Sequence, residues 1–325
     1  MTVLVTGGAG YIGSHMVLAL LDRGEDVVVL DNLSTGIREL VRAPAKLVVG
    51  DAADTATLKA VFQENNIDAT IHFAGSVVVP ESVANPLEYY RNNTATTRAL
   101  TAACVEHRIQ RFIFSSTAAV YGIPAEIPVA ETTPAIPINP YGRSKLVSEW
   151  MLSDTARAHD FHYAALRYFN VAGADPEGRS GQSTPRATHL IKRACQVAVG
   201  SESQLEVFGT DFPTHDGTGI RDYIHVADLI DAHLLALDRL RSGGESLCAN
   251  VGYGRGFSVL EVIAAVERAA ARKLNVINAA PRAGDPPALV SDPAFMKSLG
   301  WQPKYGDLDA IVQSALAWER ALRAA

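Results

Sequence analysis

The chain contains few cysteines, and it lacks both a long apolar run and an excess of positive charge. Its cysteines, Cys104, Cys195 and Cys248, are too few and too scattered for a disulfide framework or a zinc site. No apolar run approaches the roughly 20 residues that a membrane-spanning helix needs. The first residues enter a strand-like run directly, with no basic start and no cleavable apolar stretch. We therefore expect a cytoplasmic protein without a structural metal.

The balance of charge argues against nucleic acid as a partner. There are 29 Lys and Arg residues against 35 Asp and Glu residues, a net charge of −6, and no basic cluster. Apolar residues make up 48% of the chain and charged residues 20%, as in an ordinary globular protein. With 325 residues, the chain is long enough for one large domain or two moderate ones.

The first half of the chain alternates short apolar runs with helix-length segments. Strands that are apolar on both faces and separated by helices predict a parallel sheet covered on both sides. Right-handed crossovers then give an α/β fold with a Rossmann-like, doubly wound parallel sheet. The predicted strands are residues 3–7, 26–31, 46–51, 69–75 and 111–116, and the predicted helices are residues 11–23, 54–66, 85–107 and 142–159.

The last of these helices has its start signal at Pro140 and Tyr141, and its pattern is amphipathic. Its apolar stripe would carry Leu146, Trp150 and Met151. The following segment, residues 163–173, is expected to form a sixth strand that runs into a loop.

After about residue 171 the regular alternation fails, and Gly, Pro, Ser and Asp become frequent. This change predicts a smaller, mixed α/β second lobe. The predicted domains are residues 1–170 and 171–325, with part of 220–240 returning to the first domain.

The segment "TGGAGYIG" at residues 6–13 places Gly7, Gly10 and Gly13 in a G-x-x-G-x-x-G spacing between a strand and a helix. The first glycine permits the tight turn, the second lets the backbone approach a pyrophosphate, and the third permits close helix–strand packing. The segment therefore predicts a dinucleotide-binding loop.

Asp31 ends the second predicted strand, 18 residues beyond Gly13. A carboxylate there can accept hydrogen bonds from both ribose hydroxyls of an adenosine. It would repel a 2′-phosphate, and Asn32 and Leu33 offer no arginine to receive one, so NAD is favoured over NADP. Asp51, at the end of the third strand, would lie beside the adenine.

Tyr141 and Lys145, in "YGRSK", stand one helical turn apart. By itself this pair is far more typical of an ordinary exposed helix surface than of proton transfer. The fifth strand, however, brings the hydroxyls of residues 115–117 to the carboxyl edge of the sheet, where ligands of such sheets bind. A tyrosine base there would have its pKa lowered by the ammonium group and by a positive nicotinamide.

Together, "TGGAGYIG", Asp31, "FSSTAAVYG" and "YGRSK" resemble the extended short-chain dehydrogenase/reductase family. Seven further segments, spread over nearly the whole chain, resemble the UDP-glucose 4-epimerase branch of that family. They are "YIGSH", "LDNLSTG", "IHFAG", "ESVANPLEYYRNN", "RYFNVAGADPEG", "VFGTDFPTHDGTGIRDYIHVADL" and "PRAGDPP".

The resemblance implies an NAD-dependent isomerase that interconverts UDP-galactose and UDP-glucose by transient oxidation at C4. Tyr141 would remove the proton of the 4-hydroxyl, Thr117 would hydrogen-bond that oxygen, and Lys145 would stabilise the phenolate. The related dehydratases and decarboxylases carry an acidic residue after the active-site Thr. Here Ala118 and Ala119 follow it, which disfavours those reactions. A 4-epimerase of another UDP-hexose, including UDP-N-acetylglucosamine or a UDP-uronate or pentose, stays open.

The resemblance also implies a set of binding residues, with the first domain binding NAD and the second the UDP-sugar. The implied cofactor contacts are Gly7, Gly10, Tyr11, Ile12, Gly13, Asp31, Asn32, Leu33, Ser34, Gly36, Asp51, Ala52, Phe73, Ala74, Gly75, Asn92, Ser115, Tyr141, Lys145, Tyr168 and Phe169. The implied substrate contacts are Thr117, Asn170, His189, Leu190, Val207, Phe208, Arg221, Arg282, Asp285 and Leu289.

Three positions depart from the epimerase pattern. Val77 stands where a Lys usually contacts the cofactor, and His189 stands where an Asn is expected beside the substrate phosphates. Leu289 occupies the position that limits the sugar pocket, and its intermediate size leaves the breadth of substrates open. The resemblance further implies a homodimer built from helices 85–107 and 142–159.

Overall fold

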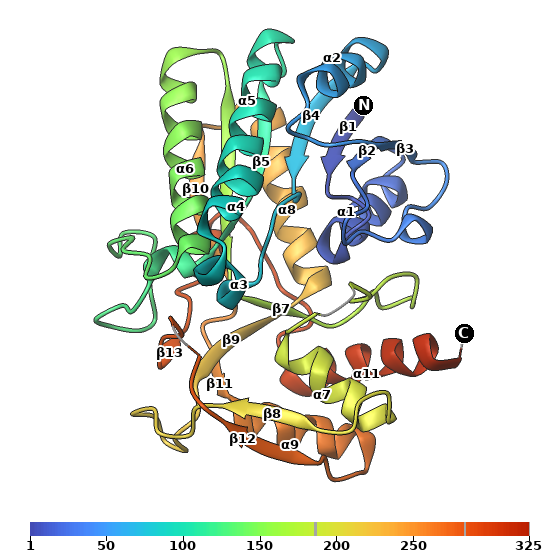
Figure 1. Cartoon of the computed structure of the whole chain (residues 1–325). Helices are drawn as coiled ribbons and strands as arrows, with labels where there is room; N and C mark the ends of the chain where they lie inside the picture. Colours follow the sequence, from blue (N-terminus) through green and yellow to red (C-terminus); the bar gives the residue numbers. More distant parts are fainter. Residues whose placement is uncertain (185–186, 283, 325) are drawn as a thin grey trace. The chain divides into compact units, whose positions relative to one another are not determined.

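The apolar runs of the first half form five neighbouring strands of a seven-stranded sheet in the computed structural model of the chain (Figure 1). The structure describes residues 1–184, 187–282 and 284–324. The strands follow the order β10-β6-β5-β4-β1-β2-β3. Their bounds are β1 Thr2–Thr6, β2 Asp26–Asp31, β3 Lys46–Val49, β4 Ile67–His72, β5 Arg111–Thr117, β6 His162–Tyr168 and β10 Leu247–Val251.

The pairs β1–β2, β2–β3, β1–β4 and β4–β5 are parallel. Because β1 has β2 on one side and β4 on the other, the chain winds outward in both directions from β1. The predicted Rossmann-like, doubly wound parallel sheet is confirmed. The carboxyl ends of the strands on either side of this switch point form the edge where such folds bind ligands.

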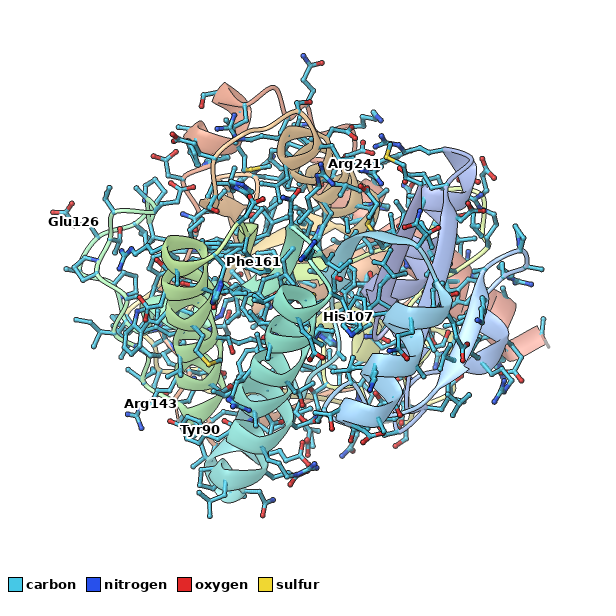
Figure 2. The ribbon with its side chains drawn as sticks, turned by 90° about the horizontal axis from the view of Figure 1, so that it is seen from above. Tyr90, His107, Glu126, Arg143, Phe161 and Arg241 are labelled. Atoms are coloured by element: carbon cyan, nitrogen blue, oxygen red, sulfur yellow. The ribbon has the colours of Figure 1, made fainter. Side chains whose placement is uncertain are left out.

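Helices cover both faces of this sheet (Figures 1 and 2). On one face, apolar side chains of α2, α5 and α6 pack against the strands in a core that includes Leu58, Leu100, Phe112 and Leu152. On the other face lie α1 and α8. The helical segments around the sheet are α1 Tyr11–Asp22, η1 Arg38–Leu40, α2 Thr55–Glu64, α3 Val79–Ala84, α4 Pro86–Tyr89, η2 Tyr90–Ala95, α5 Thr96–Glu106, η3 Ala118–Tyr121, α6 Pro140–Ala158 and α8 Val226–Arg241.

The predicted helix 85–107 is interrupted by one π-helical turn. It begins as α4, continues as the π turn η2, and ends as α5. A π turn inserts one extra residue into the hydrogen-bond ladder and therefore shifts the faces of the helix on either side of it. Figure 2 shows α5 beside α6, with Tyr90 labelled in η2 and Arg143 in α6.

The predicted helix 142–159 is present as α6, and the side chain of Asn139 caps it by accepting a hydrogen bond from the amide of Gly142 at 2.9 Å. The predicted apolar stripe is confirmed at Leu146, which is buried, and Met151 is half-buried, but the stripe is wrong at Trp150. Trp150 is 59% exposed, whereas Tyr141, Lys145 and Glu149 are buried. The buried face of this helix carries polar groups because it delivers them to the edge of the sheet.

The described residues divide into two units. Unit 1 comprises residues 1–120, 137–167 and 232–249, and unit 2 comprises residues 121–136, 168–231 and 250–325. The predicted domains differ from this division at residues 121–136 and 168–170, which group with unit 2, and at residues 241–249, which group with unit 1. The assignment of NAD binding to one unit and UDP-sugar binding to the other stays a prediction.

Unit 2 contains two small sheets and four helices that have their own core. One sheet has the order β11-β9-β13 with β7 also paired to β9, and the other is β12-β8. Apolar side chains of α7, α9 and α11 form most of the core. The elements are β7 Asn170–Ala172, α7 Leu190–Val199, β8 Leu205–Phe208, β9 Ile220–His225, β11 Gly256–Ser258, α9 Val259–Ala270, β12 Val276–Ala279, β13 Ala288–Leu289, α10 Ala294–Ser298 and α11 Leu308–Ala324.

The sixth strand expected over residues 163–173 is divided in two, so that prediction is wrong in its extent. β6 ends at Tyr168, and Asn170–Ala172 pairs instead with β9. The chain therefore leaves the large sheet immediately after Tyr168, which places Phe169 and Asn170 at the carboxyl end of β6.

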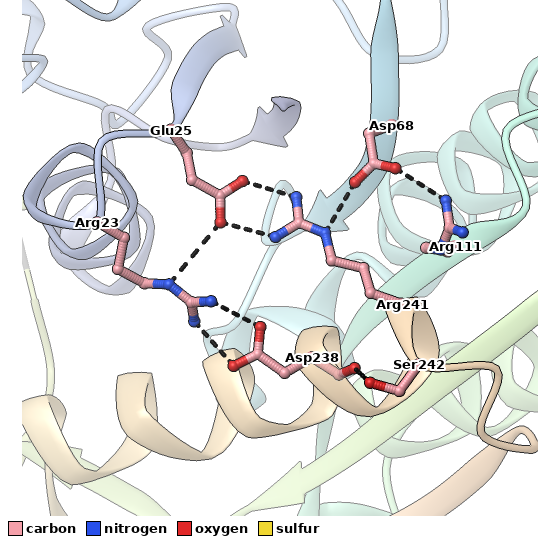
Figure 3. A network of polar contacts seen from close by, with 7 residues as sticks. All are labelled: Arg23, Glu25, Asp68, Arg111, Asp238, Arg241 and Ser242. Carbon is pink, nitrogen blue, oxygen red and sulfur yellow. Dashed lines mark hydrogen bonds and ion pairs between the residues drawn. The ribbon is translucent and has the colours of Figure 1, made fainter.

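A network of charges holds the C-terminal end of α8 to the amino ends of the strands (Figure 3). The Arg241 guanidinium donates to both carboxylate oxygens of Glu25, at 2.7 and 2.6 Å, and to Asp68 at 2.8 Å. Arg111 donates to the other oxygen of Asp68 at 2.8 Å, and Arg23 pairs with Asp238. These charges lie at the strand edge opposite the predicted ligand site.

Among the described helices, none has the length and the apolar character that crossing a membrane would require. The described residues also contain no group of three or more His, Cys, Asp or Glu side chains placed to hold a metal ion.

Candidate active site

The glycine loop between β1 and α1 has no space for side chains at two of its glycines. Gly7 adopts a left-handed φ of 71°, and a Cβ there would lie 2.5 Å from the backbone nitrogen of Ala74. A Cβ on Gly13 would lie 2.1 Å from the carbonyl oxygen of Gly7. Gly10 donates its backbone N–H to that same oxygen at 3.1 Å. The start of α1 is thereby held against the loop, an arrangement that suits a pyrophosphate at the helix N-terminus.

Asp31 lies at the end of β2 with its carboxylate against this loop. One oxygen accepts the backbone N–H of Ala9 at 2.9 Å, and the other accepts that of Leu33 at 2.8 Å. Leu33 has a left-handed φ of 57°, and Gly36 packs against the same carboxylate. Each carboxylate oxygen has a second lone pair to offer, so Asp31 can still accept hydrogen bonds from ribose hydroxyls. The residues present therefore fit the adenosine half of NAD.

The other predicted cofactor residues of unit 1 gather at the carboxyl ends of neighbouring strands. Asp51 and Ala52 follow β3, and Phe73, Ala74 and Gly75 follow β4. Tyr11 and Ile12 begin α1, Asn32 and Ser34 are exposed after β2, and Ser115 lies within β5. Asn92 donates its side-chain amide to the hydroxyl of Ser76 at 2.7 Å. Val77, which replaces the expected Lys, is exposed.

Thr117, Tyr141 and Lys145 are brought together by β5 and the first turns of α6. The hydroxyls of Thr117 and Tyr141 are hydrogen-bonded to each other. The Lys145 ammonium donates to the carbonyl oxygen of Ser115 at 2.8 Å and lies 4.9 Å from the centre of the Phe114 ring. All three predicted catalytic side chains are buried.

Burial changes the proton affinity of both titrating groups of this set. It lowers the pKa of Lys145 to about 8, with the nearby Glu149 carboxylate opposing the change. It raises the pKa of Tyr141, with the Thr117 hydrogen bond opposing. The predicted lowering of the Tyr141 pKa is therefore not a property of the chain's own residues, because the cost of burying a phenolate outweighs the effect of the Thr117 hydrogen bond. A positive nicotinamide would have to supply the lowering.

In unit 2, several predicted substrate residues lie next to one another. The guanidinium carbon of Arg282 lies 3.8 Å from the centre of the Phe208 ring. Arg221 pairs with Asp285 at 3.5 Å and lies opposite Leu289 in the β9–β13 register. Two cationic forks, an aromatic face and a carboxylate are thus available for a nucleoside diphosphate.

The remaining predicted substrate and cofactor residues of unit 2 are placed less directly for binding through their side chains. Val207 is buried in the core beneath β8, so that only its backbone could contact a ligand. His189 and Leu190 stand at the N-terminus of α7, and burial lowers the pKa of His189. Tyr168, Phe169 and Asn170 follow one another at the step from β6 to β7.

Residues 3–252 match the sequence model of the NAD dependent epimerase/dehydratase family. The chain belongs to this epimerase family. Over 98% of its length it is 55% identical to the UDP-glucose 4-epimerase of Azospirillum brasilense, of which it covers 92%. The resemblance inferred from the motifs is confirmed.

Solved structures of the epimerase family have the same fold. One is the UDP-glucose 4-epimerase of Brucella ovis in complex with NAD, which is 48% identical with a TM-score of 0.93; the match covers 97% of each chain. Another is the UDP-glucose 4-epimerase of Bifidobacterium longum in complex with NAD+ and UDP, which is 40% identical with a TM-score of 0.94. That match covers 99% of this chain and 98% of the other.

Sequence reasoning missed polar residues that surround the proton-transfer group in this member of the epimerase family. Asn93, in the π turn, accepts the backbone N–H of Ser76 at 2.8 Å and donates to the hydroxyl of Ser144 at 3.0 Å. Glu149 and Arg167 form a buried ion pair. Glu149 lies four residues after Lys145, and Asn93 and Arg167 lie within two of the segments that carry the resemblance, but only the structure shows which groups these side chains bond.

Proposed function

We propose that this chain is a UDP-glucose 4-epimerase that interconverts UDP-galactose and UDP-glucose with NAD as its cofactor. The observation that carries the proposal is the buried set of Thr117, Tyr141 and Lys145 at the end of β5. The next two residues, Ala118 and Ala119, contain no acid or base. The site therefore supports reversible oxidation at one carbon and no elimination or decarboxylation.

Tyr141 carries the proton transfer. Its phenolic oxygen accepts the proton of the sugar 4-hydroxyl and later returns a proton to the same oxygen atom. The Thr117 hydroxyl, bonded to Tyr141, holds that substrate oxygen in line. Lys145 places a positive charge next to the phenolate and is anchored by the Ser115 carbonyl. Bound NAD supplies the reversible hydride acceptor for C4.

Epimerisation requires that the sugar turn over while the rest of the substrate stays bound. Binding energy should then lie at the UDP end, away from the carbon that reacts. In unit 2, Arg221 and Arg282 are proposed to bind the diphosphate, Asp285 the uridine ribose, and Phe208 the uracil. Their pairing in the structure supports this proposal, because the forks are already oriented by Asp285 and by the Phe208 ring.

The decisive experiment supplies UDP-galactose to the purified chain and follows UDP-glucose by chromatography, with no added hydride acceptor. Conversion to an equilibrium mixture is expected. Absence of conversion, or accumulation of a 4-keto-6-deoxy sugar, would contradict the proposal. A parallel assay with UDP-N-acetylglucosamine measures how large a sugar the pocket beside Leu289 admits.

Tyr141→Phe tests the assigned base. Because the variant loses only the hydroxyl that moves the proton, we expect kcat to fall by about 10²- to 10⁴-fold while the affinity for UDP is retained. Tyr163→Phe is the matched control, since Tyr163 lies at the amino end of β6. Kinetics and calorimetric UDP titration give the two readings, and a large loss of UDP affinity in Tyr141→Phe would assign Tyr141 a structural role.

We also propose a cytoplasmic homodimer that acts in galactose metabolism. A reducing compartment suits the three free thiols, Cys104, Cys195 and Cys248. The dimer is supported by exposed apolar side chains on α3, α4 and α6, among them Val83, Leu87 and Trp150.

A further inference from the structure

The buried face of α6 is tied to β5 at three consecutive levels. Tyr141, Lys145 and Glu149 recur at intervals of four residues and therefore lie along one face of the helix. Each of them meets one of the last three residues of β5. Tyr141 bonds the Thr117 hydroxyl, Lys145 bonds the Ser115 carbonyl, and Glu149 accepts the Ser116 hydroxyl.

The Glu149 carboxylate is buried, and both of its oxygens accept hydrogen bonds. Its side chain is 7% exposed, and that of its partner Arg167 is 10% exposed. Arg167 donates to one oxygen at 3.0 Å through Nε and to the other at 2.6 Å through a terminal nitrogen. Ser116 supplies a third hydrogen bond. The carboxylate thus has a charged partner and three hydrogen-bond donors within the buried face of α6.

Few other charges face Lys145 among the described residues. His72 on β4 is its other titratable neighbour, and burial, with Lys145 adding to the effect, lowers the pKa of His72 to about 3, so that the imidazole is neutral near pH 7. Burial also raises the pKa of Tyr141 on the same helix, so that without a bound nicotinamide the phenol adds no charge near pH 7. The charges near Lys145 are then Glu149 on α6 and, behind it, Arg167 on β6.

We propose that Glu149 is a positioning residue of the proton-transfer group: held by Ser116 and Arg167, its carboxylate sets the register of α6 against β5 and keeps Lys145 positively charged. This inference rests on the function proposed above, since only that reaction requires a charged Lys145. The physical reason is that an ammonium group buried without a nearby anion releases its proton to recover the cost of desolvation. Arg167 in turn limits how strongly Glu149 attracts that proton.

Direct titration of Lys145 tests the proposal without any turnover. The full-length chain, purified with the NAD that it retains, is labelled with ¹³Cε-lysine and titrated by NMR between pH 6 and 11. Lys145→Met identifies the Lys145 signal. In Glu149→Gln, which keeps the shape and loses the charge, we expect the Lys145 midpoint to move by about one pH unit toward acid.

A matched control separates this effect from the loss of any buried ion pair. Glu25 and Arg241 form a two-pronged pair of similar burial in the same unit, with side chains 9% and 11% exposed, at the opposite edge of the sheet. Glu25→Gln should destabilise the fold to a similar degree and leave the Lys145 midpoint where it is. Equal midpoints in wild type, Glu149→Gln and Glu25→Gln would overturn the proposal.

Arg167→Gln should move the titration midpoint of Lys145 in the opposite direction. It leaves the Glu149 charge uncompensated, so that the Lys145 midpoint should rise by about half a pH unit. A general loosening of the fold cannot move the two midpoints in opposite directions. If Glu149→Gln does not fold, Arg167→Gln decides alone, and an unchanged or lower midpoint in this variant contradicts the proposal.

Activity gives a second reading. If the wild type converts UDP-galactose, the alkaline limb of its kcat profile should move with the Lys145 midpoint, toward acid in Glu149→Gln and toward alkali in Arg167→Gln. A limb that stays fixed while kcat falls equally at every pH assigns Glu149 a purely structural role. If the wild type has no activity, the proposed function fails, and the NMR midpoints still decide whether Glu149 controls the charge of Lys145.

Discussion

At the scale of single residues, His72 shows that burial at the end of β4 strongly favours the neutral form of a base. The ring is buried at the end of β4, with Nδ1 2.7 Å from the Thr6 hydroxyl and Nε2 3.1 Å from the Thr97 hydroxyl. Burial, with a contribution from the Lys145 charge, lowers its pKa from 6.5 to about 3. The neutral ring satisfies both hydroxyls, and a charged ring would add a second cation beside Lys145.

This depressed pKa predicts a pH dependence of stability. The unfolded chain binds a proton at His72 below pH 6.5 whereas the folded chain does not, so this residue's stabilisation is present above pH 6.5 and is lost toward pH 3. The slope is at most about 1.4 kcal/mol per pH unit. Between pH 6.5 and 4.5, wild type should therefore lose about 2 kcal/mol more of its free energy of unfolding than His72→Gln does.

Urea denaturation at several pH values measures the difference in slope. His159→Gln, a substitution of an exposed histidine, is the control and should follow the wild-type slope. Parallel curves for wild type and His72→Gln would show that His72 is protonated in the folded protein.

At the scale of elements, the position of α6 depends on Gly142. A Cβ at this position would lie 2.5 Å from the backbone carbonyl oxygen of Ala119 in η3. Backbone atoms cannot move aside as the end of a long side chain can. The glycine is therefore the point where the first turn of α6 closely approaches the chain that leaves β5, and the approach brings Tyr141 to Thr117.

Gly142→Ala should reverse the usual effect of this substitution within a helix. Alanine normally stabilises a helix interior by about 1 kcal/mol relative to glycine, but here the clash should destabilise the fold by about 1–3 kcal/mol. We expect kcat to fall at least tenfold while bound NAD is retained, because the helix start shifts and the glycine loop does not. The neighbouring exposed substitution Arg143→Ala is the control. A Gly142→Ala variant with unchanged stability and kcat would contradict the close approach.

The same helix shows what sequence patterns can and cannot predict about an element. Its existence, its Pro140 start and its Tyr141–Lys145 pair follow from local signals and are present in the structure. The face that it buries could not be predicted from hydrophobicity, since that face carries Lys145 and Glu149 while Trp150 is exposed. The buried Glu149 carboxylate is bonded by Ser116 of β5 and by Arg167 of β6, which lie 33 and 18 residues away along the chain.

At the scale of the whole molecule, the proposed homodimer rests on exposed apolar side chains of α4 and α6. Leu87 on α4 is 81% exposed and Trp150 on α6 is 59% exposed, on helices that contact each other. Val83 is also exposed, on α3, a helix that contacts both α4 and α6. Large apolar side chains at this degree of exposure are costly in a monomer and are common at the centres of interfaces.

Trp150→Glu should convert a dimer to a monomer, because a charged group in place of a central aromatic residue is costly to bury. Sedimentation velocity measures the change, and Leu322→Glu, on α11 in unit 2, is a control of similar chemistry that should stay dimeric. A wild-type chain that sediments as a monomer would contradict the proposed homodimer.

Local sequence determined the class of this protein and the type of its chemistry. The glycine loop, Asp31, the Tyr141–Lys145 pair and the alternation of strands and helices are short-range patterns, and each is set by the backbone geometry that it needs. Only the tertiary structure decided where residues 163–173 divide between two sheets, how the π turn presents Asn93, and that Arg167 and Ser116 hold Glu149 next to Lys145. These features depend on which distant groups become buried together, and burial is a property of the packed chain and not of any single segment.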